Sequence, residues 1–219
     1  MIRLLNTFLD ILFPESCLSC HNGSLPLCEE CIYEIPPAYD HEDNPRSCFS
    51  YAHPTMRKAI KMLKYRHAKR LAPILGKHLS EFILEDLSER GIFERIENPI
   101  IIPAPMSHKR LQQRGFNQAE LLAEIVSERT GFQLIANLLI KTRHTVPQVS
   151  LKNKRERLTN LNNAFAINID GTENNLEPIK KRNIILIDDV YTTGATSREI
   201  TRILRKSGAK KVLTYTLAH

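Results

Sequence analysis

The sequence predicts an α/β fold in which a mostly parallel sheet with flanking helices follows a small cysteine-rich segment. Beyond residue 40, short apolar runs alternate with stretches of helical period, as βαβ units require. Residues 184–187 are four consecutive apolar residues, which is typical of a strand buried on both faces of a parallel sheet. A chain of 219 residues with 42% hydrophobic content is long enough for one such domain and a small appendage.

Residues 1–40 are expected to form a segment of their own, separated from a main domain at 41–219 by a polar, proline-bounded linker. The segment contains two Cys-x-x-Cys pairs, a spacing that lets four thiolates surround one structural Zn²⁺. A metal would also explain how so short a segment folds. The expected ligands are Cys17, Cys20, Cys28 and Cys31, with His21 a bystander.

Two disulfides are the alternative arrangement of these cysteines, and they need an oxidising compartment. The apolar stretch at 1–13 is interrupted by Asp10, and no small-residue cleavage site follows it, which argues against a secretory signal. We therefore expect a cytoplasmic protein whose first residues form a docking helix, with a membrane-surface helix as the alternative. No stretch approaches the 18 apolar residues that a membrane span needs.

The main domain is expected to begin with a strand that buries Cys48 and a basic amphipathic helix at 54–64. Pro73 is well placed to open a second helix. Asn117, with Glu120 three residues later, indicates the N-cap of a third helix. Further strands are expected at 100–102, 134–135, 165–167 and 212–217, and a last helix at 197–206 before Ser207 and Gly208.

The strand at 184–187 is followed by two acids, Asp188 and Asp189, at the end of a parallel strand where ligands bind. A hydroxyl-rich loop, Thr192–Thr196, then leads into the last helix. Backbone N–H groups around Gly194 and the positive end of that helix would hold an anion, and the two carboxylates can accept hydrogen bonds from a vicinal diol. A ribose 5-phosphate fits both parts. A plain strand-turn-helix with a solvated Asp pair is the alternative.

The formal charge of +7 is unevenly distributed along the chain. Residues 44–80 contain nine Lys or Arg residues and no acid. Further basic clusters lie at 108–114 and 141–157, each flanking a predicted loop. A solvated surface would account for scattered charge, but an acid-free run of this length favours an anionic partner, either a phosphorylated small molecule or a nucleic acid.

The sequence has neither a Walker loop nor a dinucleotide-binding Gly-x-Gly-x-x-Gly motif. Residues 184–196 instead resemble, at every position, the signature for 5-phosphoribosyl-1-pyrophosphate (PRPP) of type I phosphoribosyltransferases. Several further motifs appear in the order seen in ComF/GntX-type proteins, and this resemblance covers almost the whole chain. They are the two Cys-x-x-Cys pairs, Leu63-Lys64-Tyr65-Arg66, Ile102-Pro103-Ala104-Pro105, Arg114-Gly115-Phe116-Asn117-Gln118, Thr145-x-x-Gln148 and Asn163-Ala164-Phe165. His67 departs from the family, which usually has glycine there.

The resemblance implies a type I phosphoribosyltransferase-like fold that binds PRPP with Mg²⁺. It places Asp188 and Asp189 at the ribose hydroxyls and Lys64 and Arg66 as cationic clamps. The expected 5-phosphate site comprises Thr192, Thr193, Gly194, Ala195 and Thr196, and Pro103, Ala104, Pro105 and Met106 would lie beside the pyrophosphate. Arg143 and His144 are expected in a mobile lid. The Arg114–Gln118 motif has a functional interpretation and a structural one, with Phe116 as a core anchor and Asn117 as a helix cap.

Two functions follow from this resemblance. In the first, the chain is a PRPP-binding protein of natural transformation that holds single-stranded DNA on its basic face, with competence helicases or DNA-processing proteins as partners. In the second, it is an active transferase that moves ribose 5-phosphate from PRPP to an unidentified acceptor. Only Phe49, Tyr51 and Tyr65 are aromatic residues interleaved with the basic run, and they are the available stacking platforms for bases.

Overall fold

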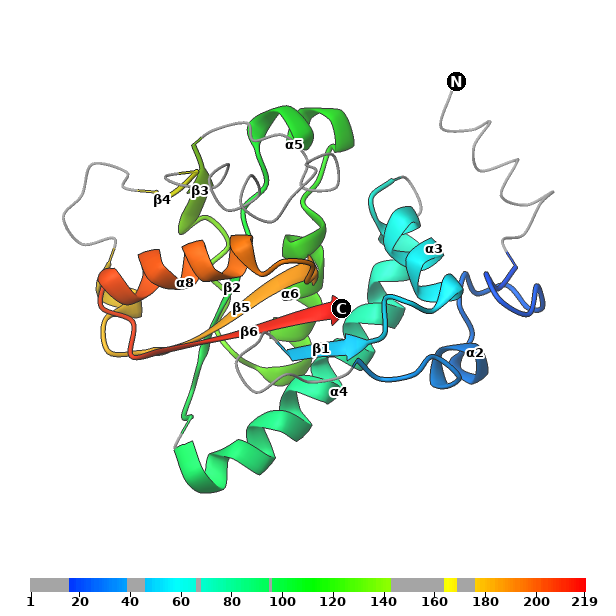
Figure 1. The fold of residues 1–219 in the computed structure, drawn as a ribbon, viewed down its shortest axis with the longest axis horizontal. Coiled ribbons are helices and arrows are strands. Elements are labelled where there is room, and N and C mark those ends of the chain that lie inside the picture. Colours follow the sequence, from blue (N-terminus) through cyan, green and yellow to red (C-terminus); the bar gives the residue numbers. More distant parts are fainter. Residues whose placement is uncertain (1–15, 39–45, 66–67, 95, 143–163, 169–175) are drawn as a thin grey trace.

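The computed structural model describes residues 16–38, 46–65, 68–94, 96–142, 164–168 and 176–219 (Figure 1). Several sequence predictions fall outside these residues. They are the helix at 1–13, the domain boundary near residue 40, the clamp Arg66 and the lid residues Arg143 and His144. The described helices include none that is long and apolar enough to cross a membrane.

The main sheet consists of four parallel strands in the order β1-β6-β5-β2. Their bounds are β1 Arg46–Phe49, β2 Ile100–Pro103, β5 Asn183–Val190 and β6 Lys211–Ala218. The predicted fold class, a mostly parallel sheet with flanking helices, is therefore confirmed. All four carboxyl ends lie at one edge of the sheet, which is where α/β proteins bind ligands.

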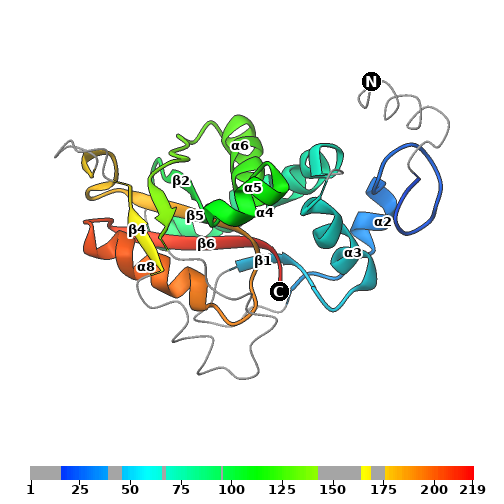
Figure 2. The ribbon, with the colours of Figure 1, turned by 90° about the horizontal axis from the view of Figure 1, so that it is seen from above.

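Strand β5 is buried on both faces because helices cover both sides of the sheet. Ile185 and Ile187 contribute to the core beneath α4 (Ala68–Glu94) and α6 (Gln118–Thr130). Ile184 and Leu186 contribute to a second core beneath α8 (Ala195–Lys206). Figure 2 shows α4 and α6 on one side of the sheet and α8 on the other. This alternation explains the continuous apolar run in the sequence.

Smaller elements surround this framework. Helix α3 (Pro54–Leu63) packs against α4 and matches the predicted basic helix. The short antiparallel pair β3 (Leu139–Lys141) and β4 (Phe165–Ile167) lies outside the main sheet. The expected strand at 134–135 is wrong, because Leu134 forms only an isolated bridge to Ile101. The remaining helices are α2 (Glu29–Tyr33), α5 (His108–Arg114) and the 3₁₀ helix η2 (Glu177–Ile179).

The prediction that Pro73 opens a helix is also wrong. Helix α4 begins at Ala68, and Pro73 lies inside it. A proline there removes one hydrogen bond and crowds the preceding turn. The helix nevertheless starts earlier because residues before the proline are buried: Leu71 and Ala72 both lie in the hydrophobic core. Tertiary packing, rather than local propensity, supplies most of the stability of such a helix.

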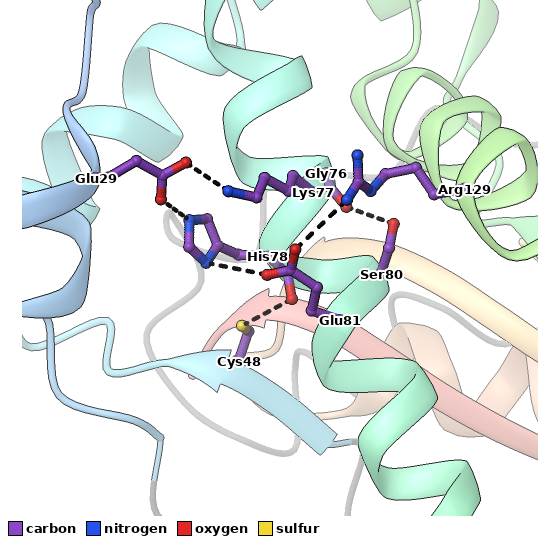
Figure 3. A network of polar contacts seen from close by, with 8 residues as sticks. All are labelled: Glu29, Cys48, Gly76, Lys77, His78, Ser80, Glu81 and Arg129. Carbon is purple, nitrogen blue, oxygen red and sulfur yellow. Dashed lines mark hydrogen bonds and ion pairs between the residues drawn. The ribbon is translucent and has the colours of Figure 1, made fainter.

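The cysteine-rich segment packs into the same core as α3 and α4. Its residues Leu27, Ile32 and Ile35 are buried among those of the two helices. A polar network continues the contact (Figure 3): the carboxylate of Glu29 in α2 accepts from Lys77 Nζ at 2.6 Å and lies 3.1 Å from His78 Nε2. The segment is thus fastened to α4 by both apolar and charged contacts.

Candidate functional site

A cavity of about 490 Å³ opens at the carboxyl ends of the parallel strands. Residues that follow β1, β2 and β5 line it, together with parts of α5, α6 and β3. Of the residues predicted from the sequence, it brings together Lys64, Ala104, Pro105, Asp188, Asp189, Thr192 and Thr196. These residues span 133 positions of the chain, so their assembly comes from the sheet topology. Their individual roles stay predictions.

The acid pair lies at the end of β5, on the floor of this cavity. Asp188 Oδ1 accepts a hydrogen bond from the backbone N–H of Asp189 at 2.8 Å, and Asp189 Oδ2 lies 3.1 Å from Lys64 Nζ. Burial, followed by the neighbouring charge of Asp189, raises the pKa of Asp188 to about 8. Lys64 caps the C-terminus of α3, and the position of that helix therefore determines the ion pair.

The loop at 192–196 has the backbone expected of an anion cradle. Gly194 adopts φ +69°, and a Cβ added there would lie 2.4 Å from the Tyr191 hydroxyl and 2.5 Å from an Arg198 nitrogen. The chain therefore needs glycine at this position for both conformation and space. Gly194 precedes α8, whose N-terminal turn contains no acidic residue. Thr192 and Thr196 face the large cavity, whereas Gly194 and Ala195 line an adjoining hollow of about 20 Å³.

The loop after β2 is held in place by Asn117. Its Nδ2 donates to the carbonyl of Ala104 at 3.0 Å, while its Oδ1 accepts from the N–H of Ala119 at 3.2 Å. Asn117 therefore caps α6, as predicted, and fastens that helix to the loop. Phe116 packs against the core from a half-buried position, in agreement with the structural interpretation of this residue. Pro103 is buried as the last residue of β2.

Three cations of the cavity were not predicted as site residues: Arg110, Arg114 and Lys141. Lys141 Nζ lies 4.9 Å from the centroid of the Phe165 ring. Burial and then the charge of Arg110 lower the pKa of Lys141 to about 8. The basic clusters in the sequence could have indicated these cations. Sequence alone, however, does not show that a residue of α5 and one of β3 line the same cavity.

The four predicted metal ligands lie together, with their sulfur atoms all within 4.8 Å of one another. Cys20 Sγ and Cys28 Sγ are 3.8 Å apart. That separation matches the edge of a tetrahedron with metal-sulfur bonds of about 2.3 Å, and it is far longer than the roughly 2.05 Å of a disulfide. Burial acts to raise the pKa of Cys17, but N–H groups of Cys28, Ser19 and Cys20 outweigh it and lower that pKa to about 6. The pKa values of the other three thiols, Cys20, Cys28 and Cys31, are raised. The spacing of the four sulfur atoms, rather than these pKa shifts, therefore shows that the cluster can hold a metal ion such as zinc.

We expect the purified protein to contain about one Zn²⁺ per chain, since four thiolates close one structural site. Replacing Cys28 and Cys31 together by Ser should remove the metal and lower the unfolding temperature, because metal binding supplies folding free energy. Elemental analysis of the folded protein measures the content. Cys48→Ser is the matched control, because Cys48 lies outside the cluster in β1. Zinc retained by the double variant would contradict the assignment.

Asp188→Asn should stabilise the protein at pH 8. An unfolded Asp ionises near pH 4, whereas the folded carboxyl keeps its proton up to about pH 8. The folding stability that this carboxyl contributes therefore falls as pH rises from about 4 to about 8. The asparagine of the variant does not titrate and so does not lose this stability. We expect a gain of about 1 kcal/mol or more at pH 8, equivalent to roughly 2–4 °C in unfolding temperature, which fades toward pH 4.

Thermal unfolding at several pH values measures this effect. Glu97→Gln, which removes an exposed acid outside the cavity, serves as the control and should show no such gain. A destabilised Asp188→Asn variant at pH 8 would show that the ionised carboxylate is favourable in the folded protein.

Curated proteins similar to this chain carry names that refer to competence and to DNA utilization. DNA utilization protein YhgH of Shigella flexneri is 31% identical over 206 residues, which cover 94% of this chain and 83% of that protein. Competence protein ComFC of Bacillus subtilis is 33% identical over 78% of this chain and 62% of its own length. Competence protein F of Haemophilus influenzae is 37% identical, and the match spans about half of each protein, 54% and 49%.

Solved structures give a more distant likeness. Glutamine PRPP amidotransferase of B. subtilis aligns over 66% of this chain and 25% of its own, with a TM-score of 0.40 and 19% identity. The hypoxanthine-guanine phosphoribosyltransferase of L. donovani aligns over 67% of this chain and 66% of its own, with a TM-score of 0.38 and 11% identity. Likeness at this level assigns no substrate and no residue role.

No protein-family model matches the chain. The similarity to YhgH nevertheless extends over almost all of this chain and most of that relative, at an identity above 30%. The chain therefore belongs to the ComF family.

Proposed function

We propose that the protein binds PRPP with Mg²⁺ in the cavity and acts in DNA uptake as a cytoplasmic protein. The observation that carries the first part is the meeting of three features in one cavity: the acid pair, the hydroxyl-rich loop before α8 and a cationic wall. PRPP needs all three, because it has a ribose diol, a 5-phosphate and a pyrophosphate. In this proposal Asp188 and Asp189 receive the diol, and the loop at 192–196 receives the 5-phosphate.

The donor set fits a magnesium complex of the ligand. Mg²⁺ is usually held by one or two carboxylates together with substrate phosphates, and the cavity offers two adjacent carboxylates beside the expected phosphate positions. Bound Mg²⁺ would neutralise part of the pyrophosphate charge. The proposed task of the chain itself is to position the ligand, with Ala104 and Pro105 beside the pyrophosphate and Lys64 as a cation near Asp189.

The same arrangement would also serve group transfer. Departure of pyrophosphate from C1 of the ribose leaves an oxocarbenium-like centre, and preorganised cations stabilise the leaving charge in such reactions. Among the described residues, Lys64, Arg110, Arg114 and Lys141 supply these cations. Pyrophosphate release in the presence of candidate bases and nucleic acids separates a transferase from a PRPP-binding module.

Mg-PRPP should bind to the native protein, and the Asp188→Asn, Asp189→Asn double variant should bind it more weakly. Loss of charge-assisted hydrogen bonds to the diol should cost about 1.5–3 kcal/mol, while the shapes of the side chains are kept. Calorimetry with and without Mg²⁺ provides the measurement, and Glu97→Gln again serves as the control. Equal affinity in the native protein and the double variant would exclude the acid pair as the diol site.

The DNA part of the proposal is supported by the relatives named for competence and DNA utilization and by the surface of α3. Arg57 and Lys61 are exposed on this helix. Tyr65, directly after it, is 60% exposed, and Tyr51 at the rim of the cavity is 37% exposed. Cations with neighbouring aromatic rings are the usual surface for single strands. DNA-processing proteins or a competence helicase are the partners that such a role would need.

Single-stranded DNA should bind with an affinity that falls steeply as salt concentration rises, because neutralised phosphates release counterions. Replacing Arg57 and Lys61 together by Ser should flatten the logarithmic salt slope by about 0.7 for each lost phosphate contact. Lys58 is left unchanged, because its Nζ donates to the carbonyl of Leu18 in the cysteine-rich segment at 3.5 Å. Fluorescence anisotropy of a labelled oligonucleotide measures the slope.

Arg205→Ser with Lys206→Ser is the matched control, since these two exposed cations lie at the end of α8, away from α3. A slope that changes equally in both double variants would indicate general electrostatic attraction. No DNA binding at low salt would remove the DNA part and leave PRPP binding as a separate question.

A further inference from the structure

Asn117 and Gln118, two neighbouring residues with side-chain amides, differ in how completely those amides are hydrogen-bonded. Both polar atoms of the Asn117 amide have hydrogen-bond partners: Nδ2 donates to the carbonyl of Ala104, and Oδ1 accepts from the N–H of Ala119. In the Gln118 amide, the oxygen Oε1 has a partner, because it accepts a hydrogen bond from an Arg114 nitrogen at 3.2 Å. Its Nε2 has no hydrogen-bond partner among the described residues. The hydrogen bonds of Asn117 therefore account for its whole side chain as a structural residue, whereas those of Gln118 leave the role of its Nε2 unexplained.

The unpartnered amide is buried and lies in the wall of the cavity. Gln118 is 2% exposed, and it lines the cavity together with Arg114. Buried polar groups are nearly always paired, because an unpaired donor loses its hydrogen bonds to water without replacement. A donor left unpaired at a cavity wall is available to a ligand.

The charge around this amide indicates the chemistry of that ligand. Among the described residues, four cations, Lys64, Arg110, Arg114 and Lys141, line the cavity together with two carboxylates, Asp188 and Asp189. Crowding among the cations is evident, because burial and the charge of Arg114 lower the pKa of Arg110. The excess of donors and positive charge suits an oxyanion.

We propose that Gln118 is a ligand-binding residue whose Nε2 donates a hydrogen bond to a phosphate oxygen. Its Oε1 holds the Arg114 guanidinium beside the same phosphate. In this proposal the phosphate is a different one from that expected at the loop 192–196, because α6 and α8 lie on opposite faces of the sheet (Figure 2). The inference deepens the proposed function: if the ligand is PRPP, the group at Gln118 is its pyrophosphate.

Gln118→Leu tests the inference, because it removes the donor and keeps most of the volume. Affinity for Mg-PRPP and for inorganic pyrophosphate should each fall about tenfold, the effect of one hydrogen bond to a charged group. Ribose 5-phosphate, which lacks the pyrophosphate group at C1, should bind within twofold of its native affinity. Gln118→Glu should weaken the two pyrophosphate ligands further, because a carboxylate repels an oxyanion. Gln112→Leu is the matched control, on an exposed residue of α5 outside the cavity.

Thermal unfolding separates binding from a structural role. A Leu at 118 removes an unpaired buried donor together with the acceptor of one hydrogen bond from Arg114, so the unfolding temperature should change little while pyrophosphate binding weakens. Lower stability together with equal loss of all three ligands would make Gln118 structural and overturn the inference. Unchanged affinity for pyrophosphate ligands in Gln118→Leu would overturn it as well.

The two proposals fail in distinguishable ways. If the native protein binds inorganic pyrophosphate through Gln118 but binds neither PRPP nor ribose 5-phosphate, PRPP binding is wrong and the oxyanion site stands. If PRPP binds equally well to the native protein and Gln118→Leu, PRPP binding stands and the role of Gln118 is wrong. If none of the three ligands binds to the native protein, both are wrong.

Discussion

Two adjacent carboxylates at the end of a strand buried on both faces are the constraint around which the site is arranged. The interior of the sheet accepts only apolar residues along β5, so polar groups first appear where that strand leaves the core. Asp188 is then half-buried beside Asp189, and burial followed by the charge of Asp189 raises its pKa. Lys64 lies against Asp189, and Arg110 and Lys141 line the same cavity.

Helix α3 connects the two candidate ligand sites of the protein. Near its middle, Lys58 donates to a backbone carbonyl of the cysteine-rich segment, and at its end Lys64 pairs with Asp189. Helix α4 adds a second connection through Arg70, whose side chain donates to the Ser24 carbonyl at 3.1 Å, and through the contacts of Glu29. The segment with the four-thiol cluster therefore rests on the same helix that places a cation in the cavity, and the two sites share one structural support.

Stability and binding make opposite demands on the cavity residues. Gly194 leaves room for the side chains of Tyr191 and Arg198 at the expense of conformational entropy, and Asp188 remains protonated above its ordinary range. Gln118 leaves a buried donor without a described partner. Each departure weakens the unliganded fold slightly, and in the proposed function an anionic or diol-bearing ligand would offset this cost. Such local costs concentrate at functional sites because selection acts there on binding as well as on folding.

The sequence by itself determined the parts of this protein that depend on local pattern. Apolar runs predicted β2, β5 and β6, helical spacing predicted α3 and α8, the Asn117 cap predicted α6, and paired cysteines predicted the cluster of four thiols. Local pattern failed at Pro73, where burial of the preceding turn outweighs a proline, and at 134–135, where the apolar pair finds too short an edge to form a strand. Only the tertiary structure decided that Arg110, Arg114, Gln118 and Lys141 face Asp188. The reason is physical: a parallel sheet brings distant chain segments to one edge, and that proximity has no counterpart in local sequence.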